Sequence, residues 1–223
     1  RLTPRESAII GWLATDGSVG SYRDRRKSLS HQGQFRAVIN QSKTEMINKI
    51  RSLLGDDATE YHALAAERTF PGKEKSSITL PRTVFCLRNG FARTLLTRAG
   101  LYDGVKADWS KLTGLVTRIS TESRSAMFEA MIDGDGQKSK AGQVKFGKKR
   151  KPGVMQAFEV LATLQGIALG GLHGSDMSGK IKMRTLRVSP HTWYKCLEVS
   201  QEIPESVWCP TTVLGTWVTR WNN

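Results

Sequence analysis

The chain has 223 residues, of which 39% are hydrophobic and 24% charged, a composition typical of a globular rather than a disordered protein. It contains 34 Lys and Arg against 20 Asp and Glu, and this net charge of +14 favours an anionic partner: nucleic acid first, an anionic membrane surface second. No apolar run approaches the ~20 residues of a membrane span. The three cysteines, Cys86, Cys196 and Cys209, show no CxxC spacing, which disfavours a zinc site or a disulfide framework. This cysteine usage favours a reducing, intracellular setting.

The first half of the chain predicts a helix, a strand and a second helix. The helix lies in "AIIGWLATDGSVG", residues 8–20. Residues 34–41 alternate apolar and polar side chains, as a half-buried strand does, and residues 43–55 have apolar side chains at helical spacing before a glycine. Residues 75–80 predict, less cleanly, a further strand with one apolar and one polar face.

The second half repeats this order. "MFEAMIDGDGQ", residues 127–137, reads as an apolar helix that ends on two aspartates separated by glycine. Residues 143–148 alternate as a strand, residues 153–166 have the spacing of a helix, and residues 180–188 alternate basic and mostly apolar side chains. The chain therefore contains two copies of one unit, about half a chain apart.

The aligned copies predict that the two helices pack closely together. Gly11 and Thr15 are four residues apart and share one helix face, and Ala130 and Gly134 do the same in the second copy. Small side chains on matching faces allow two helix backbones to approach each other. We therefore expect these helices to form an interface between the halves.

A parallel arrangement of the two helices would bring Asp16 and Asp135 together at the helix C-terminal ends. Two carboxylates that close, beside converging helix carbonyls, repel each other unless a cation lies between them. The sequence therefore predicts a site for a divalent, oxygen-preferring cation. The alternative is that each segment is an ordinary amphipathic helix ending in an Asp-Gly turn.

Both segments, read as "IIGWLATDG" and "FEAMIDGDG", resemble the LAGLIDADG motif of homing endonucleases. The final acidic residue of the motif falls on Asp16 and Asp135. Ala14 replaces the first acidic residue in copy one, whereas Asp133 keeps it in copy two. The resemblance extends over roughly residues 4–200 and implies an α+β fold: two pseudo-symmetric αββαββα halves, with antiparallel sheets forming a DNA-binding saddle and the motif helices at the central interface.

The resemblance also divides the chain. Residues 1–101 form the N-terminal half, of which residues 83–101 look like the last helical part. Residues 102–122 form the linker and the approach to the second motif helix, and residues 123–203 form the C-terminal half. The tail, residues 204–223, is rich in Thr, Val and Trp, which favour strands. It resembles a C-terminal splicing block of inteins. The alternative is a β-hairpin packed on the body of the protein.

The activity that the resemblance implies is hydrolysis of both strands of double-stranded DNA at a long, asymmetric target. Asp16 and Asp135, with the main-chain carbonyls of Thr15 and Gly134, would bind Mg²⁺; Mn²⁺ can substitute, and Ca²⁺ can bind without supporting cleavage. The enzyme would act as a monomer, a pseudo-dimer within one chain, in an intracellular, cytoplasmic compartment of a phage, bacterial or organellar host. The alternatives are a catalytically silent DNA-binding protein and an RNA maturase on the same fold.

Two further groups of residues complete the predicted site. By position, Gln41 matches a residue that orders water in the resembled family, and Lys149 is the expected catalytic residue of the second half. Strands with one apolar and one basic, polar face suit a sheet that tracks phosphates and base edges in the major groove, although a merely solvated face is the alternative. The residues expected to contact DNA are Gln34, Arg36, Asn40, Lys75, Gln143, Lys145, Lys148, Lys180, Lys182 and Arg184.

Overall fold

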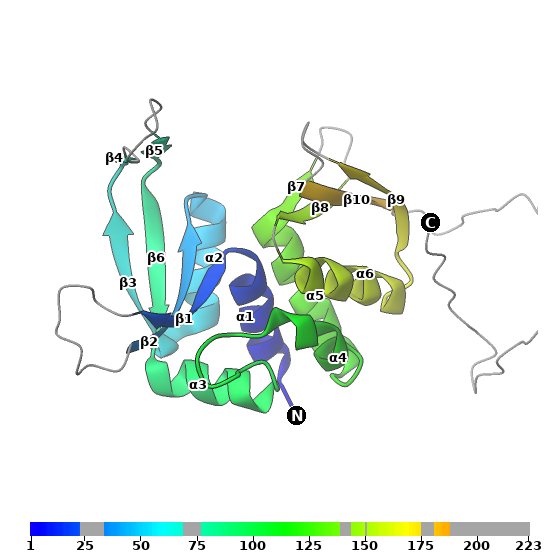
Figure 1. The fold of residues 1–223 in the computed structure, drawn as a ribbon, viewed down its shortest axis with the longest axis horizontal. Helices are drawn as coiled ribbons and strands as arrows, with labels where there is room; N and C mark the ends of the chain where they lie inside the picture. Colours follow the sequence, from blue (N-terminus) through cyan, green and yellow to red (C-terminus); the bar gives the residue numbers. More distant parts are fainter. Residues whose placement is uncertain (23–33, 69–76, 139–143, 150, 175–180, 188–223) are drawn as a thin grey trace, which may run out of the picture. The chain divides into compact units, whose positions relative to one another are not determined.

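The computed structural model describes residues 1–22, 34–68, 77–138, 144–149, 151–174 and 181–187. Figure 1 shows the helices and sheets of this part of the chain. The expected tail, residues 204–223, lies outside the described residues, as do residues 188–203 of the expected C-terminal half. No described helix is both long enough and apolar enough to cross a bilayer.

The first half contains a four-stranded antiparallel sheet in the order β1-β2-β6-β3. A two-stranded sheet, β4-β5, lies between β3 and β6 in the sequence. The elements are α1 (Pro4–Thr15), β1 (Gly17–Tyr22), β2 (Gln34–Gln41), α2 (Thr44–Leu54), β3 (Ala58–Ala63), β4 (Ala66–Arg68), β5 (Ser77–Thr79), β6 (Arg82–Leu87) and α3 (Asn89–Arg98).

Strand β6 corrects the expectation that residues 83–101 are helical. Residues 82–87 form a strand between β2 and β3, and the helix begins only at Asn89. Val84, Phe85 and Leu87 are buried because the strand lies in the interior of its sheet. A short apolar run of this kind does not distinguish a buried strand from a buried helix by periodicity alone.

The second half repeats the architecture with a sheet in the order β7-β8-β10-β9. The strands predicted at residues 143–148 and 180–188 are confirmed as β8 and β10, and the helix predicted at residues 153–166 as α6. The elements are α5 (Thr121–Asp135), β7 (Gly136–Lys138), β8 (Val144–Lys149), α6 (Pro152–Leu164), β9 (Ala168–Gly174) and β10 (Ile181–Arg187). The α+β class and the repeated helix–strand–strand–helix order are therefore as predicted.

The segment between the halves has structure of its own. It contains the 3-10 helix η2 (Trp109–Lys111) and the short helix α4 (Leu112–Val116). Helix α4 packs on α6, and its side chains Leu112, Leu115 and Val116 are buried in the common core. This segment, expected as a linker, therefore contributes to the packing of the second half.

The two motif helices pack against each other, as predicted. Helix α1 begins with a capping box in which Thr3 and Glu6 exchange hydrogen bonds, and Pro4 occupies its first turn. Buried hydrophobic residues from both halves form one cluster that includes side chains of α1, α5 and α6. The interface between the halves is thus part of the protein core, and it fixes the positions of the residues at the ends of α1 and α5.

Candidate active site

Asp16 and Asp135 stand at the C-terminal ends of the two packed helices. Asp16 is the residue that caps α1, and Asp135 is the last residue of α5. The negative charge of Asp135 acts on Asp16 strongly enough to shift its pKa. The structure therefore brings the two predicted carboxylates together.

Close backbone approach at the helix interface depends on glycine at two positions. A Cβ added to Gly11 would lie 2.8 Å from the carbonyl oxygen of Met127 and 3.0 Å from the Cβ of Ala130. A Cβ added to Gly134 would lie 2.3 Å from Thr15 Oγ1 and 2.8 Å from Thr15 Cβ. The small residues predicted to face each other do so, and they allow the aspartates to converge.

The electrostatic environment of Asp16 disfavours its charged form. Burial and then the nearby charge of Asp135 raise its pKa from 3.8 to about 6, although Lys148, Lys43 and a hydrogen bond from Gln41 oppose this rise. The neighbouring lysines do not fully offset the cost of burying the Asp16 carboxylate beside Asp135, and a cation between the carboxylates would lower that cost. The site is consequently suited to an additional cation.

Gln41 lies at the end of β2, buried on the face that carries Phe35 and Ile39. Its Nε2 donates a hydrogen bond to Asp16 Oδ2 at 2.9 Å. Its Oε1 accepts hydrogen bonds from the backbone N–H groups of Ser42 and Lys43, at 2.9 and 3.0 Å. These three contacts fix the orientation of the amide beside the Asp16 carboxylate, and the water-ordering role expected of Gln41 stays a prediction.

Lys148 occupies the position in the second half that Gln41 occupies in the first. Gly17 pairs with Ile39 in β2, and Gly136 pairs with Phe146 in β8, so the residues two places further along are Gln41 and Lys148. The ammonium of Lys148 donates hydrogen bonds to Asp135 Oδ2 and to the main-chain carbonyl of Thr15. We expected Lys149 at this place and Lys148 on the DNA-contacting face; the side chain of Lys149 lies outside the described part of the chain.

Lys151 is a further basic residue at the site that the sequence did not indicate. It precedes α6, just as Lys43 precedes α2, and its Nζ donates to the carbonyl oxygens of Ala14 at 3.0 Å and Gly17 at 3.3 Å. Burial, and then repulsion from Lys148, lower its pKa to about 8. Its signal in the sequence is only its place before a helix that follows the second strand.

The structure also accounts for the departure of the first motif copy from the second. Asp133, the first acidic position of copy two, forms an ion pair with Lys49 of α2, with Nζ 3.0 Å from Oδ2. Ala14, at the matching position of copy one, is completely buried. A carboxylate at position 14 would be desolvated, and an alanine fits there without an ionic partner.

Within the described part of the chain, the two aspartates and main-chain carbonyl oxygens supply oxygen donors at the helix ends. Among the residues that the structure describes, no group of three or more His, Cys, Asp or Glu side chains could hold a metal ion. The Thr15 carbonyl oxygen, expected as a ligand, faces the site, since Lys148 donates to it. The Gly134 carbonyl stays a predicted ligand.

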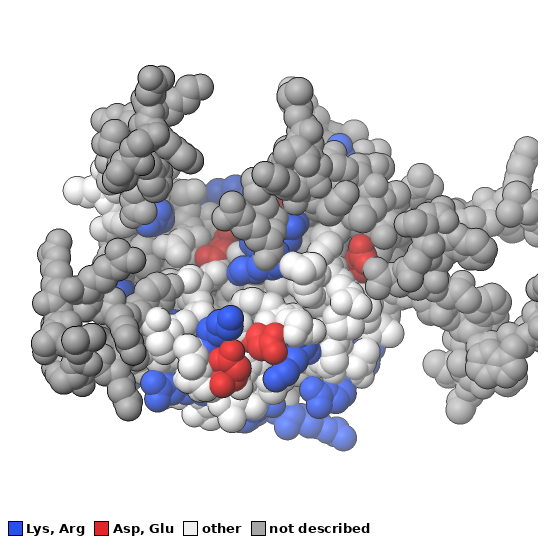
Figure 2. All heavy atoms as spheres, viewed as in Figure 1, with Lys and Arg blue, Asp and Glu red and all other residues white. Residues whose placement is uncertain are grey.

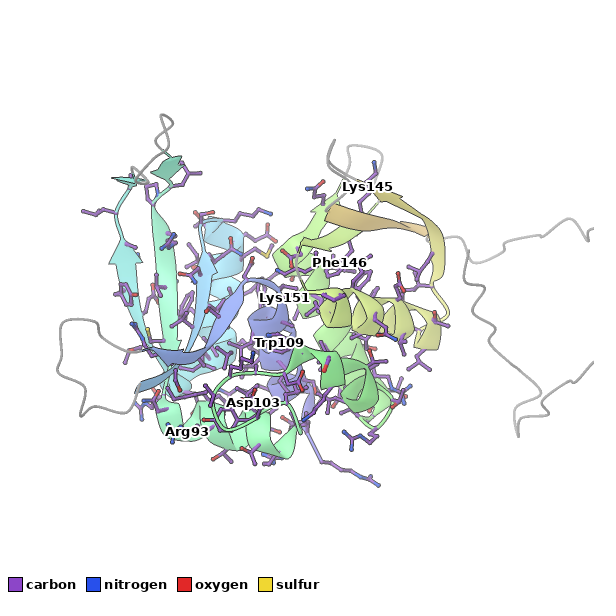
Figure 3. All side chains as sticks on the ribbon, in the orientation of Figure 1. Arg93, Asp103, Trp109, Lys145, Phe146 and Lys151 are labelled. Atoms are coloured by element: carbon purple, nitrogen blue, oxygen red, sulfur yellow. The ribbon has the colours of Figure 1, made fainter. Side chains whose placement is uncertain are left out.

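The residues expected to contact DNA are described only in part. Arg36 and Lys145 are exposed, and Asn40 is half-buried. Figure 3 shows Lys145 and its neighbour Phe146 on successive positions of β8; Phe146 is buried and stacks on Phe158 with ring centroids 3.7 Å apart. The backbones of Gln34, Lys182 and Arg184 lie in strands, whereas Lys75, Gln143 and Lys180 lie outside the described residues.

Figure 2 shows basic side chains at several places on the visible described surface, with fewer acidic ones among them.

Arg36 lies on strand β2, on the opposite face from Phe35 and Ala37, and its guanidinium is 3.6 Å from Cys86 Sγ. The alternation predicted for residues 34–41 is therefore confirmed, with one face in the core and the other at the surface.

No protein-family model matches the sequence, and a search of curated proteins gives no match. The structure is similar to solved structures of I-DmoI, including one in complex with DNA and Mn: TM-score 0.54, 10% identity, covering 82% of this chain and 89% of that chain. A second, in complex with DNA and Ca, gives a TM-score of 0.54 and 8% identity over 83% of each chain. A structure of mesophilic variants of the homing endonuclease I-DmoI gives a TM-score of 0.54 and 9% identity. The match covers 83% of this chain and 89% of that chain. With two motif helices packed so that their aspartates converge, the chain has the fold of the LAGLIDADG homing endonucleases.

Proposed function

We propose that the chain is a site-specific double-stranded DNA endonuclease that hydrolyses one phosphodiester bond in each strand with divalent metal ions held at Asp16 and Asp135. The observation that carries this proposal is the convergence of two carboxylates at the ends of pseudo-symmetric helices, each in contact with a polar side chain from its own half: Gln41 with Asp16, and Lys148 with Asp135. The fold supports it, since I-DmoI, solved with DNA and Mn, shares the architecture.

The residues present fit a hard divalent cation, and we propose Mg²⁺. The ammonium of Lys148 is bound by a carboxylate oxygen of Asp135 and the Thr15 carbonyl, which are the oxygen donors that such a cation prefers. Asp16 and the Gly134 carbonyl would complete the protein ligands, as the sequence predicted. Mn²⁺ would substitute, and Ca²⁺ would bind without supporting cleavage. The bound metal would activate water for in-line attack and stabilise the leaving oxygen.

The side chains around the aspartates have separate roles in this proposal. Gln41 holds one carboxylate oxygen of Asp16 with one N–H, and its second N–H is available to orient water. Lys148 takes the role that the sequence assigned to Lys149. Together with Lys151 it places positive charge where negative charge develops on the phosphate.

We propose that the surface faces of the two sheets dock DNA. Arg36, Asn40 and Lys145 would contact phosphates or base edges, as would the other positions predicted on the strands. Because the two halves differ in sequence, the target should be asymmetric. Residues 1–101 and 123–203 would each serve one strand, so one chain suffices as a monomer within an intracellular compartment.

Cleavage of a randomised double-stranded DNA library in Mg²⁺ tests the function. Enrichment of one long, asymmetric site with cuts in both strands is expected. If the protein retains one DNA sequence without cutting it, the function is that of a silent DNA-binding protein. A preference for structured RNA over every DNA in a gel shift would support a maturase.

A further inference from the structure

The segment that joins the two halves provides an aromatic side chain beside Lys151. Trp109 belongs to η2, and its ring centroid lies 5.5 Å from Lys151 Nζ. Figure 3 shows the two labelled side chains close together near the start of α6. An ammonium at this distance from an indole ring is attracted by the negative face of the ring.

The backbone around Trp109 is held firmly against the start of α6. A Cβ added to Gly153 would lie 2.5 Å from the carbonyl oxygen of Trp109, so only glycine permits this approach. On the other side, Asp108 Oδ1 accepts hydrogen bonds from Ser110 N at 3.1 Å and Ser110 Oγ at 2.6 Å. The backbone that carries the indole is therefore fixed on both sides.

Lys151 needs such a partner because its surroundings disfavour a positive charge. Its side chain is partly withdrawn from water, and Lys148 is a neighbouring cation. The charges of Asp135 and Asp16 oppose this effect, and the ammonium also donates to the carbonyl oxygens of Ala14 and Gly17. The polarisable face of Trp109 adds a favourable contact without adding a negative charge that would compete for a metal.

Among the described residues of the first half, no aromatic ring contacts the ammonium of Lys43 as Trp109 contacts that of Lys151. Lys43 precedes α2 as Lys151 precedes α6, but the side chain of Lys43 is exposed. The segment containing Trp109 occurs once in the chain, so it acts on one of the two pseudo-symmetric lysines. The two active sites are consequently unequal in how they hold their basic residue.

We propose that Trp109 is a positioning residue: it holds the ammonium of Lys151 at the carboxyl end of α1, and so the joining segment supports cleavage of one DNA strand more than the other. This inference rests on the proposed endonuclease function. It gives the joining segment a role in the chemistry of one half, beyond covalent connection.

The test compares Trp109→Leu, which removes the aromatic face, with Trp109→Phe, which keeps it. The matched control is Phe91→Leu, because Phe91 also faces a cation, Arg5, with 5.8 Å between the ring centroid and Cζ, away from the aspartates. Each strand of the selected target is labelled separately. Trp109→Leu should slow cleavage of one strand about tenfold and the other by less than threefold. Trp109→Phe should restore the lost rate to within about threefold, and Phe91→Leu should leave the strand ratio unchanged.

A second measurement does not depend on cleavage. Trace acetylation of the DNA-free protein, read by mass spectrometry, reports how exposed and how neutral each lysine amine is. Labelling of Lys151 should rise at least threefold in Trp109→Leu, while labelling of Lys43 stays constant. Unfolding temperatures identify any variant that has simply lost its fold.

Unchanged Lys151 labelling in a folded Trp109→Leu protein would overturn the inference. Equal slowing of both strands would overturn it as well. If the wild-type protein cuts no DNA, the proposed function fails, and raised labelling would then still support the contact between Trp109 and Lys151.

Discussion

Gly134→Ala tests whether the close approach of the two motif helices is as tight as the structure shows. The new Cβ would lie 2.3 Å from Thr15 Oγ1, and ordinary contact begins at 3.4 Å, so one helix must move by about 1 Å. Thr15 cannot turn away freely, because its hydroxyl donates to the carbonyl oxygens of Gly11 at 3.0 Å and Trp12 at 3.2 Å. Overpacking of this kind costs about 1–3 kcal/mol.

The intrinsic helix preference of alanine offsets part of that cost, by about 0.5–1 kcal/mol. We expect a net loss of about 1–2 kcal/mol, which lowers the unfolding temperature by roughly 2–8 °C for a chain of this size. Gly114→Ala in α4 is the matched control, because a Cβ there meets no atom within 4 Å and only the helix preference applies. That variant should gain up to about 1 kcal/mol.

Equilibrium unfolding of both variants in denaturant, followed by circular dichroism in EDTA, measures the two changes. Adding Thr15→Ala to Gly134→Ala removes the shortest contact, so the double variant should lose less stability than the two single losses combined. A Gly134→Ala protein as stable as the wild type would refute the close packing of α1 against α5. Equal losses in Gly134→Ala and Gly114→Ala would refute it too.

Three further outcomes follow from the charges. In metal-free buffer the folded-state pKa of Asp16, about 6, exceeds its ordinary 3.8, so the folded state binds this proton more tightly. The contribution of Asp16 to stability is therefore fully present below about pH 4 and is lost as the pH rises through about 6, so the stability difference between wild type and Asp16→Asn, measured by unfolding at several pH values, should shift against the wild type across this range. Lys148→Met frees the carboxylate and carbonyl oxygens to which its ammonium donates, so Mn²⁺ should bind the DNA-free protein roughly tenfold more tightly, as calorimetry would measure. Cleavage should nevertheless slow about 100-fold, because a positive charge near the phosphate is lost. Weaker Mn²⁺ binding would contradict this expectation. Arg36→Gln or Lys145→Gln should each reduce the slope of log affinity for DNA against log salt by about 1, and Lys111→Gln, on η2, should leave it unchanged.

The sequence predicted those parts of the fold whose pattern is local and repeated. Gly11 and Thr15 in one helix, and Ala130 and Gly134 in the other, have a spacing that puts small side chains on one face of each helix, so the helix interface could be inferred from them. The alternation of residues 34–41 likewise reported a strand with one buried face. In each case the relevant residues are neighbours along one element.

Other strands escaped prediction because their surroundings decide their conformation. Strand β3 is mostly exposed at the edge of its sheet and has no apolar alternation to reveal it. Strand β6 has the opposite problem, since it is buried at most positions and reads equally well as part of a helix. Pairing with distant strands selects the extended conformation in both cases.

The basic residues of the site depend on register and on long-range contacts. Lys148 and Lys149 are adjacent, and only the pairing of Gly136 with Phe146 distinguishes the counterpart of Gln41. The connections between the first two strands differ in length between the halves. Counting residues from the motif therefore does not identify which lysine corresponds to Gln41. The contact of Lys151 with Trp109 and with the end of α1 joins segments that no local pattern relates.

The target selected from the library allows the roles of Asp16 and Asp135 in cleavage and in binding to be separated. Wild-type protein and the Asp16→Asn and Asp135→Asn variants are compared for cleavage in Mg²⁺ and for binding in Ca²⁺. Both variants should lose cleavage, while affinity for the target changes by less than about tenfold, because the aspartates would act in the chemistry rather than in docking. Undiminished cleavage of both strands by either variant would contradict a metal site shared by Asp16 and Asp135.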